Sequence, residues 1–424
     1  MTNRWRIIPY YLLLKNQVNL RRCYNKFKVD IMLELILNPV ENLPYLFNIE
    51  VPDKLKGLYV SDKVKNEEMV RNSKIAFSGR ENINLEVRKI YKKWQEQLNA
   101  KHLSMRLLSG LHAHIILFMG LGKIGDTLLL LPEIAGGHYA SKQILERLGY
   151  HVIEMIPDMK NYCIDIPKTK ELILKARPNL IFVDRSEGLY YEDFTELIED
   201  LPYECGTIFD ASQYLTNILE HDFISPFDMG FDIMMATLHK NFPGPQKALV
   251  CTKNDNIYWE HIEDAMSSYV SNLHVENIIL AGSILEKHDI LKKYSSLMLS
   301  NSIALEKELI EHKLPVVNRR FDKVSTHHLW LSFTSANDAY EFYRKMESCG
   351  LMVNYRKLPY NLGMGIRMGT SAATLQGLNQ ENISILASLI ADIYYSRCVS
   401  TSLINRVQKY ISNLMPITQT EERI

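Results

Sequence analysis

The stretch ATLHKNFPGPQKALV, residues 236–250, decides the fold class. It places His239 and Lys240 between an apolar segment and the turn sequence PGP. Proline fixes φ and glycine allows conformations closed to other residues, so this turn is expected to be well defined. The pattern therefore predicts a lysine held on rigid backbone at the end of a buried strand. A positioned and partly desolvated amine has a lowered pKa and can form a Schiff base.

Outward from this stretch, the chain alternates between apolar, β-rich segments and helical spacers. The apolar segments cover residues 126–132, 151–157, 179–184, 206–210, 231–236 and 247–252. The gaps between the first five hold a helix and two turns, which predicts βαβ units and a mainly parallel sheet. Ligands of such sheets bind beyond the carboxyl ends of the strands. Asp184, Asp210 and the His239–Lys240 pair fall at or just after such ends, so we expect the site there.

The residue types at these ends suggest the cofactor pyridoxal 5'-phosphate (PLP). A carboxylate such as Asp210 opposite Lys240 would keep the pyridine nitrogen protonated, so that the ring accepts electrons. Ser109 and Gly110 open an apolar helix, where free N–H groups and the helix dipole favour a phosphate. His138 follows two glycines that allow close approach to a flat ring. Alone, His138 would be interpreted as a capping or surface histidine. Together with the other residues, it is a candidate for stacking on the cofactor ring.

Composition sets the limits on function. With 424 residues, 46% of them hydrophobic, the chain can bury a large core, in two domains. Lys+Arg and Asp+Glu both number 49, so nothing indicates nucleic acid or a membrane surface as a partner. The six cysteines are scattered, which predicts no metal site and fits a reducing, cytoplasmic location. The apolar run at 114–131 is broken by charges too early to span a bilayer, so no integral membrane segment is predicted.

The chain is expected to divide into three parts. Residues 1–60 form an N-terminal extension and arm, 61–290 a large PLP-binding domain, and 291–424 a small α+β domain reached through a long helix. Residues 1–29 carry seven basic residues and no acidic one. This segment is either a targeting or surface-binding arm, or an extension that packs on the body or precedes a start at Met32. We favour the second interpretation.

Taken in order, the motifs resemble those of the serine hydroxymethyltransferase family. LELILNPVEN at 33–42 is similar to the family's LELIASEN, and GIRMGTSAAT at 365–374 to GIRIGTPAVT. Between them lie SGLHA, AGGHYA, FDASQ and TLHKNFPGPQ, each similar to a family motif in the same order. The resemblance implies an α/β fold of the aspartate aminotransferase-like class, PLP fold type I. This fold has a mainly parallel central sheet in a large domain and a smaller α+β C-terminal domain.

The resemblance also implies a role for individual residues. Lys240 would bind PLP covalently, Asp210 would pair with the pyridine nitrogen, and His138 would stack on the ring. The residues implied at the cofactor are Ser109, Gly110, His138, Asp210, Gln213, His239 and Lys240. Those implied near the amino-acid substrate are Glu81, Ser186, Arg367 and Gln376. Because the family builds each site from two chains, and residues 269–277 resemble its interface loop, a homodimer is implied.

Departures from the family pattern concern the substrate. Leu375 and Gln376 stand at the two candidate positions for the family arginine that binds the α-carboxylate, and a neutral amide at that position forgoes about 1.5–3 kcal/mol. Arg80, Arg185 and Arg367 are alternative anchors. Glu133 stands where the family has an apolar residue on its folate-binding wall, which weakens the expectation that tetrahydrofolate binds.

Two functions from different classes remain open at this point. The first is a PLP enzyme that makes or breaks the Cα–Cβ bond of an amino acid, by hydroxymethyl transfer, aldol cleavage or transaldol transfer. The second is a PLP-binding homologue that has lost this chemistry and acts as a regulatory or structural protein. We favour the enzyme, because a scaffold has no physical need for a Schiff-base lysine opposite a carboxylate. An aminotransferase on the same fold fits the motifs less well.

Overall fold

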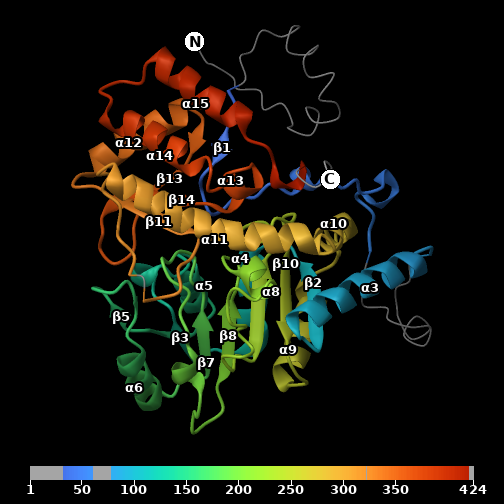
Figure 1. Ribbon diagram of the computed structural model, residues 1–424. Coiled ribbons are helices and arrows are strands. Elements are labelled where there is room, and N and C mark those ends of the chain that lie inside the picture. Colours follow the sequence, from blue (N-terminus) through green and yellow to red (C-terminus); the bar gives the residue numbers. More distant parts are fainter. Residues whose placement is uncertain (1–31, 61–77, 321, 420–424) are drawn as a thin grey trace, which may run out of the picture.

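The computed structural model describes residues 32–60, 78–320 and 322–419. It has a large lobe around a central sheet and a smaller lobe formed mainly by the C-terminal part of the chain (Figure 1). The long helix α11 (His288–Glu311) runs between the two lobes. The basic segment at 1–29 lies outside the described residues.

The central sheet of the large lobe has seven strands in the order β2-β10-β9-β8-β7-β3-β4. They are β2 (His102–Leu107), β3 (Thr127–Leu130), β4 (His151–Glu154), β7 (Leu180–Val183), β8 (Gly206–Asp210), β9 (Ile233–Thr237) and β10 (Ala248–Thr252). Strand β10 is antiparallel to both of its neighbours, and the pairs from β9 to β4 are parallel. The mainly parallel sheet predicted from the sequence is therefore confirmed. The prediction missed β2, whose buried Ser104 and Arg106 hide its strand character.

Alternate residues of these strands enter two apolar cores. Leu180 and Phe182 of β7 face a core shared with α4 (Gly110–Leu121) and α9 (Ile257–Tyr269). Ile181 and Val183 face the opposite core, which contains residues of α3 (Glu81–Leu98), α10 (Val275–Leu285) and α11. A strand that is covered on both faces has apolar residues at every position. This is why the sequence LIFV of β7 could be predicted as a strand.

The smaller lobe is an α+β unit, as predicted. Its antiparallel sheet has the order β11-β14-β13, from β11 (His328–Ser332), β13 (Asn354–Lys357) and β14 (Met364–Gly369). Helices α12 (Ala336–Ser348), α14 (Ile383–Tyr395) and α15 (Thr401–Asn413) complete it. Near the N-terminus, β1 (Leu35–Ile36) pairs in parallel with β12 (Leu351–Met352), so the N-terminal arm is part of this lobe's core. The predicted domain boundaries stay a prediction.

Shorter elements connect these layers. They are α5 (Ser141–Arg147), β5 (Pro157–Asp158), β6 (Cys163–Ile164), α6 (Ile166–Ala176), α7 (Thr195–Ile198), α8 (Leu215–Leu219), α13 (Ser371–Leu375) and 3₁₀ turns at Pro44–Phe47, Asp53–Leu55, Glu133–Ala135 and Ile417–Gln419. Within the described ranges, none of the helices has the length and apolarity needed to cross a bilayer.

Candidate active site

Lys240 lies three residues beyond the carboxyl end of β9, on a loop fixed from two sides. The loop is closed by two backbone hydrogen bonds, Leu238 N to Lys247 O at 2.9 Å and Gly244 N to Leu238 O at 2.7 Å. A Cβ on Gly244 would lie 2.6 Å from Leu238 O, so this turn requires glycine. From the N-terminal arm, Asn42 Nδ2 donates to Lys240 O at 2.5 Å. The rigid presentation of Lys240 predicted from the sequence therefore has a physical basis.

Asp210, the last residue of β8, is a buried carboxylate held in its ionised form. His114 Nε2 donates to Asp210 Oδ2 at 2.8 Å, and Ser212 N donates to Oδ1 at 2.8 Å. Burial alone would raise the pKa of Asp210, but the hydrogen bond from His114 and the charges of His114 and Lys240 outweigh it and lower this pKa to about 2. In turn, burial lowers the pKa of Lys240, while the charge of Asp210 acts in the opposite direction.

The sequence did not predict the histidine that holds Asp210. His114 lies on α4 and is flanked by Ser141, whose Oγ is 3.4 Å from His114 Nδ1 and donates to Asp184 Oδ2 at 2.5 Å. Burial raises the pKa of Asp184 well above its usual range. His114 sits in an apolar helix and its partner follows 96 residues later, so no local pattern indicates the pair. The available signal was its position four residues after Gly110, on the same helix face.

His138 is placed beside this network. Its ring lies 5.3 Å from that of His114 in an edge-on arrangement, and Ala140 N donates to its Nδ1 at 3.3 Å. Burial, with the nearby charges of His114 and Lys240, lowers the pKa of His138 to about 4. Burial, with the charge of Lys240, likewise lowers the pKa of His239 to about 4. Both histidines are therefore neutral at physiological pH.

Ser109 and Gly110 form the N-terminus of α4, next to the end of β9. The Ser109 side chain caps the helix by accepting from His112 N at 3.3 Å. A Cβ on Gly110 would lie 2.6 Å from Thr237 Cγ2. Only a residue without a side chain lets the helix N-terminus approach β9 this closely, and free N–H groups at such a terminus favour an anion.

We expect Gly110→Ala to weaken PLP binding by roughly tenfold or more, because overpacking typically costs about 1–3 kcal/mol and would displace the N-terminus of α4. PLP titration followed by absorbance measures the effect. Adding Thr237→Ser removes the clashing methyl group and keeps the hydroxyl, so the double variant should regain affinity. Unchanged binding in Gly110→Ala, or no recovery in the double variant, would contradict this role.

Four buried polar atoms at the ends of β7, β8 and β9 have no hydrogen-bond partner among the described residues. They are Asp184 Oδ1, Gln213 Nε2, Thr237 Oγ1 and His239 Nδ1. A buried polar atom without a partner costs about 1–3 kcal/mol, so a cluster of them at one edge of a sheet indicates a polar ligand. With a lysine, an ionised carboxylate and a glycine-lined helix N-terminus, this donor and acceptor set fits PLP.

The remaining predicted residues are placed as follows. Gln213 Oε1 lies 3.2 Å from His328 Nε2, at the contact between the lobes. Ser186 follows β7, and its backbone N donates to Gly136 O at 2.8 Å. Glu81 is exposed at the first turn of α3, and no hydrogen bond or ion pair in the described structure joins it to the other site residues. Arg367 is buried on β14.

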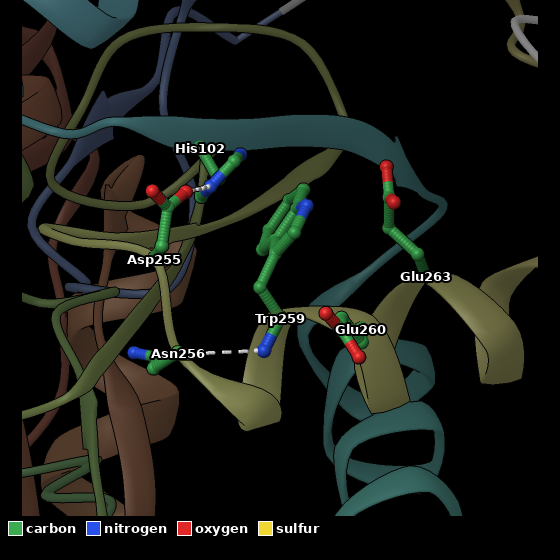
Figure 2. Close-up of a pocket in the computed structure, with 6 residues that line it drawn as sticks. All are labelled: His102, Asp255, Asn256, Trp259, Glu260 and Glu263. Atoms are coloured by element: carbon green, nitrogen blue, oxygen red, sulfur yellow. Dashed lines mark hydrogen bonds and ion pairs between the residues drawn. The ribbon is translucent and has the colours of Figure 1, made fainter.

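A separate surface pocket of ≈470 Å³ lies at the opposite edge of the central sheet. It is lined by His102, Asp255, Asn256, Trp259, Glu260 and Glu263 (Figure 2). His102 begins β2 and pairs with Thr252, at the far end of β10 from Lys240. Its ring stacks on Trp259 with centroids 5.1 Å apart, and its Nε2 lies 2.7 Å from Asp255 Oδ1. None of the predicted site residues lines this pocket.

The fold and the residues at the ends of β7, β8 and β9 define a fold type I PLP enzyme. The family model of serine hydroxymethyltransferase matches residues 81–390, and the chain belongs to this family. It is accordingly a PLP-dependent enzyme of the serine hydroxymethyltransferase type, acting on the Cα–Cβ bond of an amino acid.

Individual relatives are distant. Serine hydroxymethyltransferase of Pyrobaculum neutrophilum is 24% identical over 369 residues, which are 85% of this chain and 83% of that protein. An L-threonine:uridine-5'-aldehyde transaldolase of a Streptomyces species is 26% identical over 298 residues, 69% of this chain and 70% of that protein. Among solved structures, L-threonine transaldolase from Pseudomonas fluorescens, in its internal aldimine state, has a TM-score of 0.82 at 21% identity. That match covers 91% of this chain and 88% of the other, and it supports the fold.

Proposed function

We propose that PLP is bound at the carboxyl ends of β8 and β9, covalently through Lys240, and that the enzyme cleaves or forms β-hydroxy-α-amino acids. The observation that carries this proposal is that Asp210, held by His114 and Ser212, and Lys240 lie at the same strand ends as four unpaired buried polar atoms. When bound, PLP supplies an electron sink for the pair of electrons left on Cα. Cleavage of R–CH(OH)–CH(NH₃⁺)–COO⁻ gives R–CHO and glycine, with no oxidant or reductant.

The protein residues would position the cofactor and hold the charge beside its ring nitrogen. Asp210, fixed by His114 and Ser212, keeps a negative charge where the ring nitrogen would lie. Ser109, Gly110 and His239 would hold the phosphate at the N-terminus of α4. His138 is neutral and would pack its ring on the cofactor without adding a competing positive charge.

The proposal also covers the oligomeric state, the cellular location and the use of folate. We propose a homodimer, with residues 269–277 as one interface segment, which is supported by the 55% exposure of the large Tyr269 side chain. A cytoplasmic location is supported by the five described cysteines, which are all free. We propose that the cleavage does not require tetrahydrofolate, which is supported by the exposed carboxylate of Glu133 in the 3₁₀ turn after β3, where the family resemblance implies an apolar residue.

The proposed chemistry can be tested at Cα without knowing the aldehyde. In D₂O the PLP-loaded protein should exchange an α-proton of glycine, followed by ¹H NMR, because the electron sink stabilises the Cα carbanion. Heat-denatured protein with the same PLP gives the background rate. Exchange no faster than this background, at any glycine concentration, would count against the proposed function.

A further inference from the structure

The side chain of Gln376, at the position where the family resemblance implies the α-carboxylate anchor, is hydrogen-bonded to the protein backbone. Gln376 Oε1 accepts from Ile36 N at 2.8 Å, and its Nε2 donates to Glu34 O at 2.7 Å. Both polar atoms of the amide therefore hold the β1 segment. Any amino acid that binds here needs a different partner for its carboxylate.

Two of the alternative arginines are also engaged elsewhere. Arg185 donates to Ala135 O, to Tyr360 Oη at 2.9 Å and to Glu192, all in a buried setting. Arg80 is bound on the outside of the protein, where it donates to backbone carbonyls of Tyr59 and Ser78. Arg185 is therefore buried with both terminal nitrogens engaged, and Arg80 is tied to the backbone of Tyr59 and Ser78 at the surface.

Arg367 and Arg356 form a different arrangement on the sheet of the small lobe. Asn354 is the register partner of Arg367, and Arg356 lies two residues further along β13, so all three share one face. Asn354 Oδ1 accepts from Arg367 Nη2 at 2.9 Å. On the same face, Glu187 Oε1 lies 2.7 Å from Arg356 Nη2, and Glu187 Oε2 lies 3.7 Å from Arg367 Nη1.

The charges of this cluster do not balance. Two guanidinium groups meet one carboxylate, and the Arg367 and Glu187 side chains are only 5% and 2% exposed. Burial is the main reason that the pKa of Arg367 is lowered to about 10; the charge of Glu187 opposes this shift and the charge of Arg356 adds to it. Among the described residues, the hydrogen bonds and the short ion pair of the two arginines use Nε and Nη2, and Glu187 Oε2 has no donor. A buried, uncompensated positive charge is costly unless an anion pairs with it.

The cluster also adjoins the loop that carries His138. Glu187 N donates to Gly136 O at 3.1 Å, in the loop that presents His138. After burial and Asp210, the charge of Arg367 is the next influence on the pKa of Lys240. The charge of Arg356 contributes to the lowered pKa of His138, after burial, His114, Lys240 and Asp210. Arg356 is 30% exposed, so a ligand can reach the pair from solvent.

We propose that Arg356 and Arg367, positioned by Glu187 and Asn354, bind the α-carboxylate of the amino-acid substrate. This inference rests on the proposed function and names the residues that replace the family's carboxylate anchor. A guanidinium N–H forms a strong, charge-assisted hydrogen bond to a carboxylate, and Nη1 of Arg356 and Nη1 of Arg367 can each donate to one carboxylate oxygen.

The test compares glycine with glycinamide, which lacks the carboxylate, by absorbance titration of PLP-loaded protein. Wild-type protein should bind glycine far more tightly than glycinamide. In Arg356→Gln we expect glycine affinity to fall roughly 10- to 100-fold while glycinamide affinity and PLP content stay unchanged. Lys357→Gln is the matched control, because it removes an equal charge from the next, exposed position of β13 and should alter nothing. Arg356→Lys keeps the charge without the guanidinium group and should fall between.

The outcomes distinguish a failure of the carboxylate site from a failure of the proposed function. Equal losses for glycine and glycinamide in Arg356→Gln would show that Arg356 only ties the two lobes together and would overturn the carboxylate site. Unchanged glycine affinity would overturn it as well. If wild-type protein carries PLP but responds to no amino acid, the proposed function fails, and the carboxylate site fails with it.

Discussion

Lys240→Ala protein is expected to hold no covalently attached PLP and to lose at least about 10³-fold in turnover, the scale typical of removing a covalent or proton-transferring group. The reason is structural: Lys240 is the amine that β9, the PGP turn and Asn42 fix beside Asp210. Borohydride reduction followed by peptide mass analysis should find pyridoxyl phosphate on the 236–250 peptide of the wild type and none in the variant.

Lys253→Ala provides the control for this experiment. Lys253 follows β10 at the end of the sheet opposite Lys240, and its Nζ pairs with the exposed Asp228 at 3.2 Å, so its removal should leave the label on Lys240. A label that persists in Lys240→Ala, or that sits on another lysine of the wild type, would refute the assignment of Lys240.

Asp210→Asn should keep PLP on Lys240 and lower turnover by about 10²–10³-fold, the scale of losing one preorganised electrostatic contact. The substitution preserves the shape of the side chain but removes the negative charge that His114 and Ser212 stabilise. A neutral amide cannot keep the pyridine nitrogen protonated, so the ring accepts electrons less well. Steady-state rates measure the loss of turnover, and the PLP content of each preparation shows whether the cofactor is retained.

Asp228→Asn, a change at an exposed carboxylate, should leave the rate as in the wild type. If Asp210→Asn retained more than a tenth of the wild-type turnover with full PLP content, Asp210 would not have the proposed role.

Local sequence patterns predicted the parts of the site that lie at strand ends. Strand β7 reads as an apolar run because both of its faces are buried, and Lys240 is marked by the PGP turn that follows it. The residues that were missed act over long separations. His114 reaches Asp210 across 96 residues and Asn42 reaches Lys240 across 198, and such pairs follow only from the packing of the whole fold.

The residues proposed for substrate recognition were also beyond the reach of local sequence patterns. Gln376 stood out as a departure from the family motif, yet its binding to the β1 backbone depends on a separation of 340 residues. Arg356 carries no local signal, because a lone arginine on a half-exposed strand is usually a surface residue. Its importance emerges only when β13, β14 and Glu187 are brought together by the contact between the lobes.

The most direct test of the central claim is glycine formation from β-hydroxy-α-amino acids. PLP-loaded wild-type protein is incubated with a panel that includes L-threonine and L-serine, and glycine and aldehyde are quantified by ¹H NMR. We expect glycine and aldehyde to appear in equal amounts with at least one member of the panel, and neither to appear with Lys240→Ala protein. Wild-type protein that carries PLP on Lys240 but releases no glycine from any member, with or without tetrahydrofolate, would contradict Cα–Cβ bond cleavage as its function.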